Sequence, residues 1–495
     1  MKSDYGREAC VLGSFAAILL VVLDCASPLR AQTPDSIAER QRAVESGLVP
    51  EVIVASDPDP GYGIYEGMRR DSVPGLSVAV INDGAVEWAK GYGAKRSGSS
   101  DSVVVSTLFQ AASVSKPIAA TAALQLVDDG RLTLDDNVNR WLRSWRVPEN
   151  EYTAQRPVTL RGLLSHTAGL TVHGFPGAPS DEPVLSPVEV LEGVGKMKPV
   201  RIDTIPGAIF RYSGGGYVVA QVLAQDVTGH CFPTLMERTV LDPLGMYRST
   251  YVQPLPEWLE DSAAFGHRGD STPVESGWHN YPGEAAAGLW TTPTDIARFA
   301  LGIHDAYEGT PGALLQQSTA RKMLSEQKDN WGLGPEVYGE GDSLQFSHRG
   351  SNTGYRAFFV LYPETGDGVA VMTNSEAGGG LMFDVARAVA SVYQWPTFQP
   401  ETRTVVEVPT ETLADYVGDY QVPSGAEITV TRDEDQLLVD VPGEDTVPLL
   451  AESKAVFFPK GEEARLAFKR DSTGRVTHFI LRQENSETKA VRQVP

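Results

Sequence analysis

The stretch Gln110-Ala-Ala-Ser-Val-Ser-Lys-Pro117 lies between a hairpin pattern and an apolar segment, and these surroundings decide the fold. Before it, residues 76–90 form two apolar runs around Asn82-Asp-Gly84, which predicts a strand, a tight turn and a second strand. After it, apolar residues recur at helical spacing and Gly130 follows, which predicts a helix over residues 108–127. Ser113 should therefore open an apolar helix beside a sheet.

The remainder of the chain contains both helical and strand patterns before its character changes near residue 396. Helices are predicted over residues 218–227, 232–240, 293–303 and 381–393, and strands over residues 355–361 and 368–372. Strands at both ends with helices between them predict an α/β or α+β architecture whose sheet is assembled from distant segments. After a linker at residues 395–400, short apolar runs alternate with turns rich in Gly, Asp and Pro. That pattern predicts an all-β sandwich or barrel of about a hundred residues.

Charge and the N-terminal segment limit the partners and the location of the protein. The 495 residues include 42 Lys and Arg against 64 Asp and Glu, a net charge of −22. Nucleic acid requires a basic surface and is therefore not an expected partner, and anionic membranes are disfavoured. Residues 11–23 form an uncharged apolar run, interrupted only by Ser14. This run is too short to span a bilayer but is suited to a signal peptide over residues 1–31. We expect an exported protein, periplasmic or secreted, with no membrane span after cleavage; an uncleaved anchor is the alternative.

The motif Ser-x-x-Lys occurs three times, and its context separates the copies. Ser325 to Lys328 and Ser486 to Lys489 lie among charged residues, which predicts solvated surfaces. Ser113 and Lys116 instead open the apolar helix, where residues i and i+3 share one face. Burial there would favour a neutral amine that can take the serine proton, and the helix N-terminus would stabilise an oxyanion.

Other catalytic signatures are absent from the sequence. It has no G-x-S-x-G, no H-E-x-x-H, no G-x-x-x-x-G-K-[ST] and no C-x-x-C. A conventional α/β-hydrolase, a zincin and a P-loop enzyme are therefore disfavoured. We expect no metal or organic cofactor. Signal cleavage would leave Cys231 as the only cysteine, and its helical surroundings predict a buried structural thiol.

Several ordered motifs together resemble the serine β-lactamase and penicillin-binding-protein superfamily, particularly its CubicO-like branch of esterases and D-amino-acid peptidases. The motifs are residues 110–117, Leu163-Leu-Ser-His-Thr-Ala-Gly-Leu170, Phe210-Arg-Tyr-Ser-Gly-Gly-Gly-Tyr217, Val240-Leu-Asp-Pro-Leu-Gly-Met246, Gly288-Leu-Trp-Thr-Thr-Pro-Thr-Asp-Ile296 and His348-Arg-Gly-Ser-Asn-Thr-Gly354. The resemblance implies a catalytic domain over residues 36–395 with an antiparallel sheet flanked by helices. Tyr416-Val-Gly-Asp-Tyr420 resembles the start of a lipocalin-like, DUF3471-type barrel, which implies a second domain over residues 401–495.

The resemblance also implies roles for individual residues. Ser113 would be acylated, Lys116 would take its proton, and Tyr212 would shuttle the proton, as a phenolate near the ammonium, to the leaving group. The second motif, usually Tyr-x-Asn, has Gly214 at its third position. Without that amide, β-lactam turnover and classical peptide recognition are less expected than hydrolysis of simple esters.

The third motif, Lys-Thr-Gly in β-lactamases, would correspond to His348-Arg-Gly350, which leads into an extended run. The resemblance implies that His348 complements negative charge or holds the proton relay. The amide of Ser351 would be the second oxyanion donor after that of Ser113, and Gly350 would let the substrate approach the strand. The other His-Arg-Gly triplet begins at His267, which we assign to a surface turn, and His166 is assigned a structural role.

These residues support a serine hydrolase that forms an acyl-enzyme on small ester or peptide-like substrates. Esterase, D-amino-acid peptidase and residual β-lactamase activities all stay open. The alternative is a non-catalytic, penicillin-binding-like receptor or scaffold that uses the same pocket, which Gly214 favours. The intact Ser113, Lys116, Tyr212 and His348 favour the enzyme. The oligomeric state is not visible in the sequence.

Overall fold

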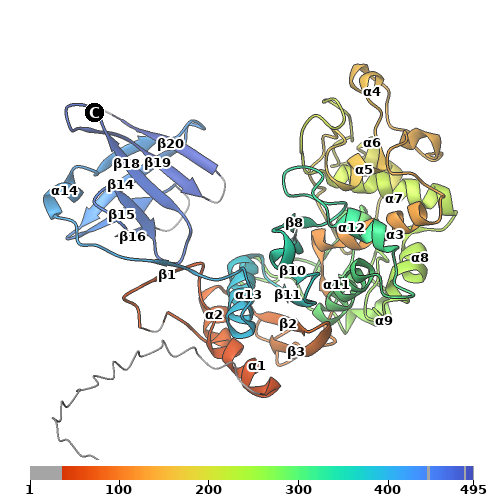
Figure 1. The fold of residues 1–495 in the computed structure, drawn as a ribbon, viewed down its shortest axis with the longest axis horizontal. Helices are drawn as coiled ribbons and strands as arrows, with labels where there is room; N and C mark the ends of the chain where they lie inside the picture. The colour runs from red at the N-terminus through yellow and green to blue at the C-terminus, as the bar shows by residue number, and fades with distance from the viewer. Residues whose placement is uncertain (1–35, 59, 443–445, 484–485, 494–495) are drawn as a thin grey trace, which may run out of the picture. The chain divides into compact units, whose positions relative to one another are not determined.

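The protein contains a six-stranded sheet and a separate closed barrel (Figure 1). The computed structural model describes residues 36–58, 60–442, 446–483 and 486–493. The signal peptide predicted over residues 1–31 lies outside the described residues. Within the described ranges, no helix is long and apolar enough to cross a membrane.

All neighbouring strands of the six-stranded sheet are antiparallel, in the order β3-β2-β11-β10-β9-β8. These strands are β2 Gly75–Asn82, β3 Ala85–Gly93, β8 Glu336–Tyr338, β9 Gln345–Asn352, β10 Tyr355–Tyr362 and β11 Asp367–Thr373. Strand β2 of the N-terminal hairpin pairs with β11, which lies about 290 residues further along the chain. The prediction of a sheet assembled from distant segments is therefore confirmed.

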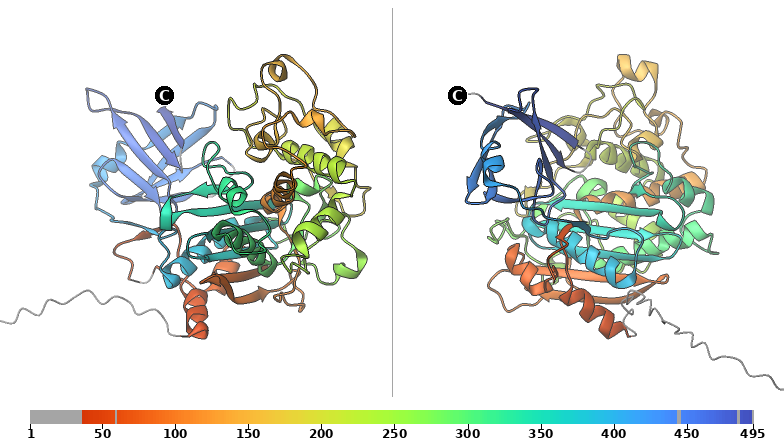
Figure 2. Two further views of the ribbon diagram at one scale, coloured as in Figure 1. Left: turned by 45° about the vertical axis from the view of Figure 1, so that its right-hand side comes forward. Right: turned by 60° about the vertical axis from the view of Figure 1, so that its left-hand side comes forward.

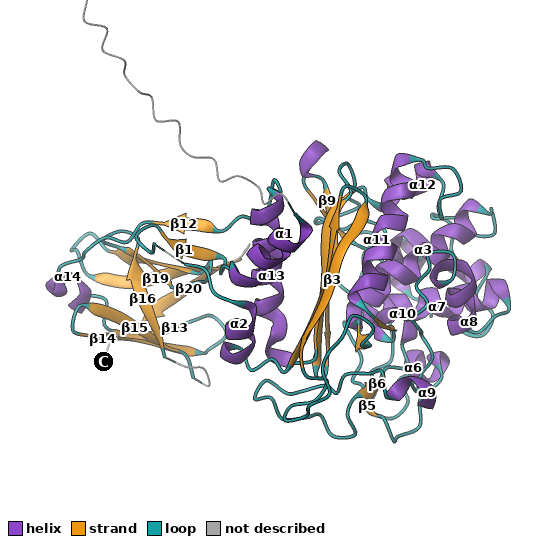
Figure 3. Cartoon of the chain, turned by 90° about the horizontal axis from the view of Figure 1, so that it is seen from below, coloured by secondary structure: helices purple, strands orange, loops and turns teal. Residues whose placement is uncertain are grey.

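Helices cover both faces of this sheet because its strands are apolar on both faces (Figure 3). Successive side chains of a strand point to opposite faces. Val78 and Val80 of β2 pack in one cluster with α13, α1 and α2, whereas Ala79 and Ile81 pack in the other with α3, α7 and α11. The predicted α/β (α+β) fold class, with an antiparallel sheet flanked by helices, is confirmed.

The helices have the following bounds. They are α1 Ile37–Ser46, α2 Ile64–Arg70, α3 Ser115–Asp128, α4 Glu151–Gln155, α5 Leu160–Leu164, α6 Pro187–Glu192, α7 Gly214–Thr228, α8 Phe232–Met236, α9 Glu257–Glu260, α10 Glu284–Ala287, α11 Pro293–Glu308, α12 Gln317–Met323, α13 Gly379–Tyr393 and α14 Thr410–Ala414. The predicted helix over residues 232–240 is a short α-helix followed by a π-helical turn at Glu237–Leu241. Short strand pairs lie outside the main sheet: β1 Val52–Val54 with β12 Glu401–Arg403, β4 Phe109–Gln110 with β7 Trp290–Thr291, and β5 Ala178–Pro179 with β6 His279–Asn280.

The C-terminal region closes into an eight-stranded antiparallel barrel, which Figure 2 shows from two further directions. Its strands are β13 Gly418–Gln421, β14 Glu427–Asp433, β15 Gln436–Asp440, β16 Val447–Ala451, β17 Val456–Pro459, β18 Arg465–Arg470, β19 Val476–Gln483 and β20 Ser486–Arg492. The interior is packed with apolar side chains, and the rings of Tyr416 and Phe468 stack with centroids 4.4 Å apart. Of the two predicted alternatives, sandwich and barrel, the barrel is confirmed.

Candidate active site

Ser113 lies on a sharp turn between a strand and a helix. The expected helix from residue 108 is wrong at its start: β4 is followed by a 3₁₀ turn at Ala112–Val114, and α3 begins at Ser115. Ala112 has φ +49°, a left-handed backbone conformation that residues other than glycine rarely adopt. The hydroxyl of Ser115 accepts a hydrogen bond from the amide of Leu289 (3.1 Å) and donates to the carbonyl of Ala112 (2.5 Å). These contacts fix the turn that presents Ser113.

Lys116 is buried, and its amine lies beside the serine. Lys116 Nζ is 3.0 Å from Ser113 Oγ and donates to the carbonyl of Ala286 at 2.7 Å. The side chain is 2% exposed, and burial lowers the pKa of Lys116 to about 7. A substantial fraction of the amine is therefore neutral at physiological pH. Pro117 falls in the first turn of α3, where a helix needs no backbone donor.

Tyr212 belongs to the loop that precedes α7, and its ring lies beside the amine of Lys116. Lys116 Nζ lies 4.8 Å from the centre of the Tyr212 ring. Burial raises the pKa of Tyr212 above its ordinary value, and a hydrogen bond with the side chain of Ser113 offsets this only in part. Burial therefore disfavours the phenolate of Tyr212, and the group with a pKa near neutrality is Lys116.

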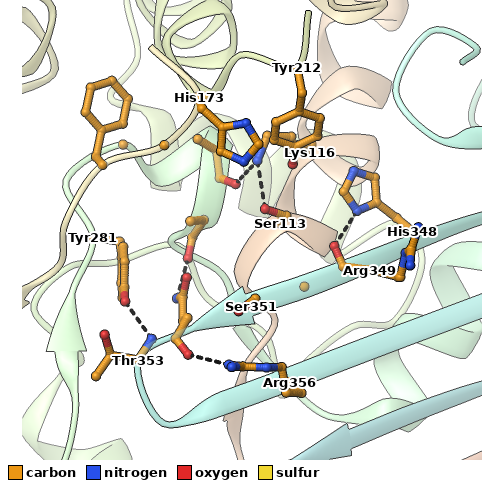
Figure 4. Close-up of a pocket in the computed structure, with 18 of the residues that line it drawn as sticks. Ser113, Lys116, His173, Tyr212, Tyr281, His348, Arg349, Ser351, Thr353 and Arg356 are labelled. Carbon is orange, nitrogen blue, oxygen red and sulfur yellow. Dashed lines mark hydrogen bonds between the residues drawn. The ribbon is translucent and has the colours of Figure 1, made fainter. Parts of the chain in front are cut away.

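His348 lies on strand β9, just past the point where β8 stops pairing with it and β9 becomes the edge strand of the sheet. Strand β8 pairs only with residues 345–347, so residues 348–352 have no strand partner on the side of the pocket within the described residues. A Cβ on Gly350 would lie 2.2 Å from the carbonyl oxygen of Ala111, so the backbone of β9 directly abuts the turn that carries Ser113. Ser351 is the next residue and is exposed. Figure 4 shows Ser113, Lys116, Tyr212, His348 and Ser351 around one pocket.

The protonation state of His348 follows from its hydrogen bond. His348 Nδ1 lies 2.7 Å from the carbonyl oxygen of Arg349, and because a carbonyl can only accept, Nδ1 carries the proton. Burial and the nearby Lys116 lower the pKa of His348 to about 3. Its Nε2 is therefore an unprotonated acceptor, and it has no hydrogen-bond partner among the described residues. A neutral His348 cannot complement negative charge as the lysine of Lys-Thr-Gly would.

The presence of glycine at position 214 is explained by the close approach of the backbone there to the loop at residue 173. It is the first residue of α7, and its amide donates to the carbonyl of His173 at 2.8 Å. A Cβ at this position would lie 3.0 Å from the same oxygen. An asparagine here would require the loop at residue 173 to shift. The imidazole of His173 instead packs against Tyr212, with ring centroids 4.8 Å apart.

The pocket has a volume of about 910 Å³ and contains residues that the sequence motifs did not reveal. Trp331 forms edge contacts with the rings of Tyr212 and His348, and Glu336, the first residue of β8, lines the same pocket. The amide of Asn352 donates to Gln110 Oε1 (2.8 Å) and so ties β9 to the stretch before Ser113. Gln110 belongs to the opening motif, whereas Trp331 and Glu336 carry no local signal because only the folded chain brings them to the site.

Three assignments outside the pocket are also settled. The prediction that His267 lies in a surface turn is wrong. His267 is fully buried, and its ring nitrogens contact the carbonyl of Asn374 and the amide of Ser97. Cys231 is exposed rather than buried, because it precedes α8 and its thiol points to Thr234 Oγ1. The other two Ser-x-x-Lys copies are not helical: one follows the end of α12 and the other lies in β20.

The described residues contain no cluster of His, Cys, Asp and Glu suited to a metal ion.

Comparison with known proteins connects this site to a family. The Beta-lactamase family model matches residues 64–394, and the model of a domain of unknown function, DUF3471, matches residues 402–492. Penicillin-binding protein 4 of Amycolatopsis lactamdurans is 28% identical over 73% of this chain and 97% of its own length. Protein flp of Staphylococcus aureus is 25% identical, and the chain spans only 61% of that protein's length.

Solved structures share the fold at lower identity. The octameric penicillin-binding protein homologue from Pyrococcus abyssi has a TM-score of 0.58 at 22% identity, over 86% of this chain and 98% of that chain. The D-amino acid amidase from Ochrobactrum anthropi SV3 has a TM-score of 0.57 at 21% identity, over 72% of this chain and 99% of that chain. The family model matches about two thirds of the sequence, and the chain belongs to the Beta-lactamase family, a family of serine hydrolases.

Proposed function

We propose that this protein hydrolyses small esters or amides through an acyl-enzyme at Ser113. The observation that carries the proposal is the 3.0 Å contact between Ser113 Oγ and the amine of Lys116, whose pKa burial lowers to about 7. A buried neutral amine at hydrogen-bond distance is a competent base for a serine hydroxyl. Ordinary exposed lysines are protonated at neutral pH and cannot act as a base for the serine hydroxyl.

The steps follow from the arrangement of the site. Neutral Lys116 takes the proton of Ser113 Oγ as the oxygen attacks the substrate carbonyl carbon. The oxyanion accepts hydrogen bonds from the amides of Ser113 and Ser351. As the bond to the leaving group breaks, the proton held by Lys116 passes to that group, with the hydroxyl of Tyr212 as the relay beside Ser113. Water then attacks the acyl carbon and gives a proton to Lys116. Lys116 returns that proton to Ser113 Oγ as the acyl bond to the serine breaks, which restores the neutral amine and the free hydroxyl.

Substrates with few polar requirements fit this pocket best. The neutral His348 provides no cation at the position of the third motif, where the cation of β9 is instead Arg349, and Gly214 provides no amide beside Lys116. Both features favour simple esters or D-amino-acid amides over β-lactams. One similar fold belongs to a D-amino acid amidase, which supports including amides among the candidate substrates.

Labelling with a fluorophosphonate tests the nucleophile. We expect the intact mass to rise by one label, and Ser113→Ala to remain unlabelled. Ser325→Ala, at the exposed second copy of the motif, is the matched control and should label as the unmodified protein does. Label retained in Ser113→Ala would disprove the assignment. A labelled protein that turns over no p-nitrophenyl ester, D-alanyl anilide or chromogenic cephalosporin would favour the receptor or scaffold.

Gly350 provides a second test, of the oxyanion strand. Gly350→Ala should push β9 away from Ala111 and lower kcat/KM about 100-fold, the cost of one oxyanion donor. Gly379→Ala is the control, because Gly379 also lines the pocket but a Cβ there meets nothing within 4 Å. Equal activities of the two variants would contradict the role of β9.

We further propose that the chain is exported after removal of residues 1–31, and that residues 36–395 and 401–495 are separate domains. The apolar run at residues 11–23 supports export. The N-terminal sequence of the exported protein tests the cleavage site. A mature protein that begins at Met1 would favour the uncleaved anchor.

A further inference from the structure

His166, in the loop after α5, contacts Tyr212 and the residues on both sides of it. The carbonyl of His166 accepts a hydrogen bond from the amide of Arg211 at 2.9 Å. Its Nδ1 accepts one from the amide of Ser213, also at 2.9 Å. The imidazole stacks on the Tyr212 ring, with centroids 4.2 Å apart and planes 30° from parallel. One residue therefore holds the backbone on both sides of Tyr212 and the face of its ring.

This arrangement requires a neutral histidine. Because the Ser213 amide donates to Nδ1, that nitrogen has no proton, and the proton of the neutral ring is on Nε2. The side chain of His166 is 2% exposed, and burial together with the nearby Lys116 lowers its pKa well below the ordinary value. Nε2 has no hydrogen-bond partner in the described part of the chain. A protonated ring would lose the bond to Ser213 without gaining one.

The backbone at His166 is unusual in a way that serves the same contacts. Its φ of +59° is left-handed, a conformation that residues other than glycine rarely adopt. In this conformation the carbonyl and the ring of one residue both reach the loop at residues 211–213. Asparagine tolerates this conformation better than most residues, which is useful for a conservative variant.

We propose that His166 is a positioning residue that fixes the hydroxyl of Tyr212 beside Ser113. It acts through Tyr212 and touches neither the nucleophile nor the substrate. The inference rests on the proposed function, in which Tyr212 passes a proton to the leaving group. Removing His166 should therefore impair proton transfer by Tyr212 more than substrate binding.

A double-mutant cycle with Tyr212→Phe tests this inference. His166→Phe retains a stacking ring but removes the acceptor of the Ser213 amide. We expect it to lower kcat about tenfold, a coupling of ordinary size for residues in contact, with KM changed less than twofold. In Tyr212→Phe, which lacks the hydroxyl, His166→Phe should cause no further loss. The loss should be larger for phenyl acetate than for p-nitrophenyl acetate, because the poorer leaving group depends more on the proton.

A second variant keeps the test valid if His166→Phe folds poorly. His166→Asn retains an acceptor and suits the left-handed backbone, so it should keep more activity than His166→Phe. The matched control is His267→Phe, at a buried histidine that does not line the pocket and also accepts a backbone hydrogen bond, from Ser97. Rates are divided by the fraction of protein that a fluorophosphonate labels. The control should lower stability but leave the normalised kcat unchanged.

The outcomes separate this inference from the proposed function. Label on Ser113→Ala would disprove the proposed function. If Ser113→Ala stays unlabelled, an equal loss of kcat from His166→Phe with and without the Tyr212 hydroxyl overturns the positioning role alone. A lower melting temperature with unchanged normalised kcat, as expected for the His267 control, would also overturn it.

Discussion

Lys116 and Asp384 are both buried ionisable groups of this chain, but their partners differ. Asp384, in α13, is 4% exposed and is bound by Arg387 (2.6 Å), Arg70 (3.2 Å) and the hydroxyl of Tyr62. Lys116 is 2% exposed, and no ion pair within the described residues includes it. Among the described residues, its amine forms hydrogen bonds only with the hydroxyl of Ser113 and the carbonyl of Ala286, and it lies over the rings of Tyr212 and Tyr217.

The difference separates a structural charge from a reactive one. A buried carboxylate that is bound by basic side chains ties the elements that carry them together. A buried amine without a carboxylate loses its proton readily, because burial penalises the ammonium and nothing compensates. Removing Lys116 should therefore affect chemistry, and removing Asp384 should affect stability.

The largest effect is expected for Lys116→Ala. Loss of the base should lower kcat/KM about 1,000-fold, within the range for general-base catalysis, while the protein remains folded. Steady-state kinetics with the best ester substrate measure it. Lys489→Ala, in the third copy of the motif on β20, is at an exposed lysine and should leave kcat/KM within twofold. A loss below tenfold for Lys116→Ala would mean that another group is the base.

Asp384→Ala should have the next largest effect, on folding. It leaves the buried guanidinium of Arg387 without its carboxylate, so we expect the free energy of unfolding to fall by about 3 kcal/mol. Urea denaturation measures the change, and kcat per labelled site should stay near that of the unmodified protein. An unchanged stability together with a large loss of normalised kcat would contradict the structural role.

A smaller effect is expected on the pH dependence of stability. Between about pH 7 and the ordinary lysine pKa of 10.5, the unfolded chain binds a proton at Lys116 that the folded protein does not. The free energy of unfolding should therefore rise with pH in this window, by up to about 1.4 kcal/mol per pH unit relative to Lys116→Met. Denaturation of both proteins at pH 7, 8 and 9 tests this. Parallel profiles would indicate that Lys116 is charged when folded.

Much of the fold could be predicted from the sequence because its signals are local. The hairpin of β2 and β3 and the strands β10 and β11 followed from apolar runs and turns. The start of α3 was missed because Ala112 adopts a left-handed φ without a glycine to indicate it. The strands β13 and β20 give little local signal, because most of their residues are polar and are not buried.

The sequence predicted those residues of the site that belong to recognisable motifs. Ser113, Lys116, Tyr212 and His348 line one pocket. The neutral state of His348 could not be inferred, because it depends on burial and on a backbone carbonyl. The burial of His267 depends on Asn374, more than 100 residues away, and the contact of His166 with the loop at residues 211–213 likewise exists only in the folded chain.

The central claim is that neutral Lys116 activates Ser113, and the pH dependence of fluorophosphonate labelling tests it most directly. The labelling rate of the unmodified protein should rise tenfold per pH unit below about pH 7 and level off above it, because only the unprotonated amine takes the serine proton. Lys116→Ala should label slowly without this inflection. A rate independent of pH between 5 and 9, or the same inflection in Lys116→Ala, would contradict the claim.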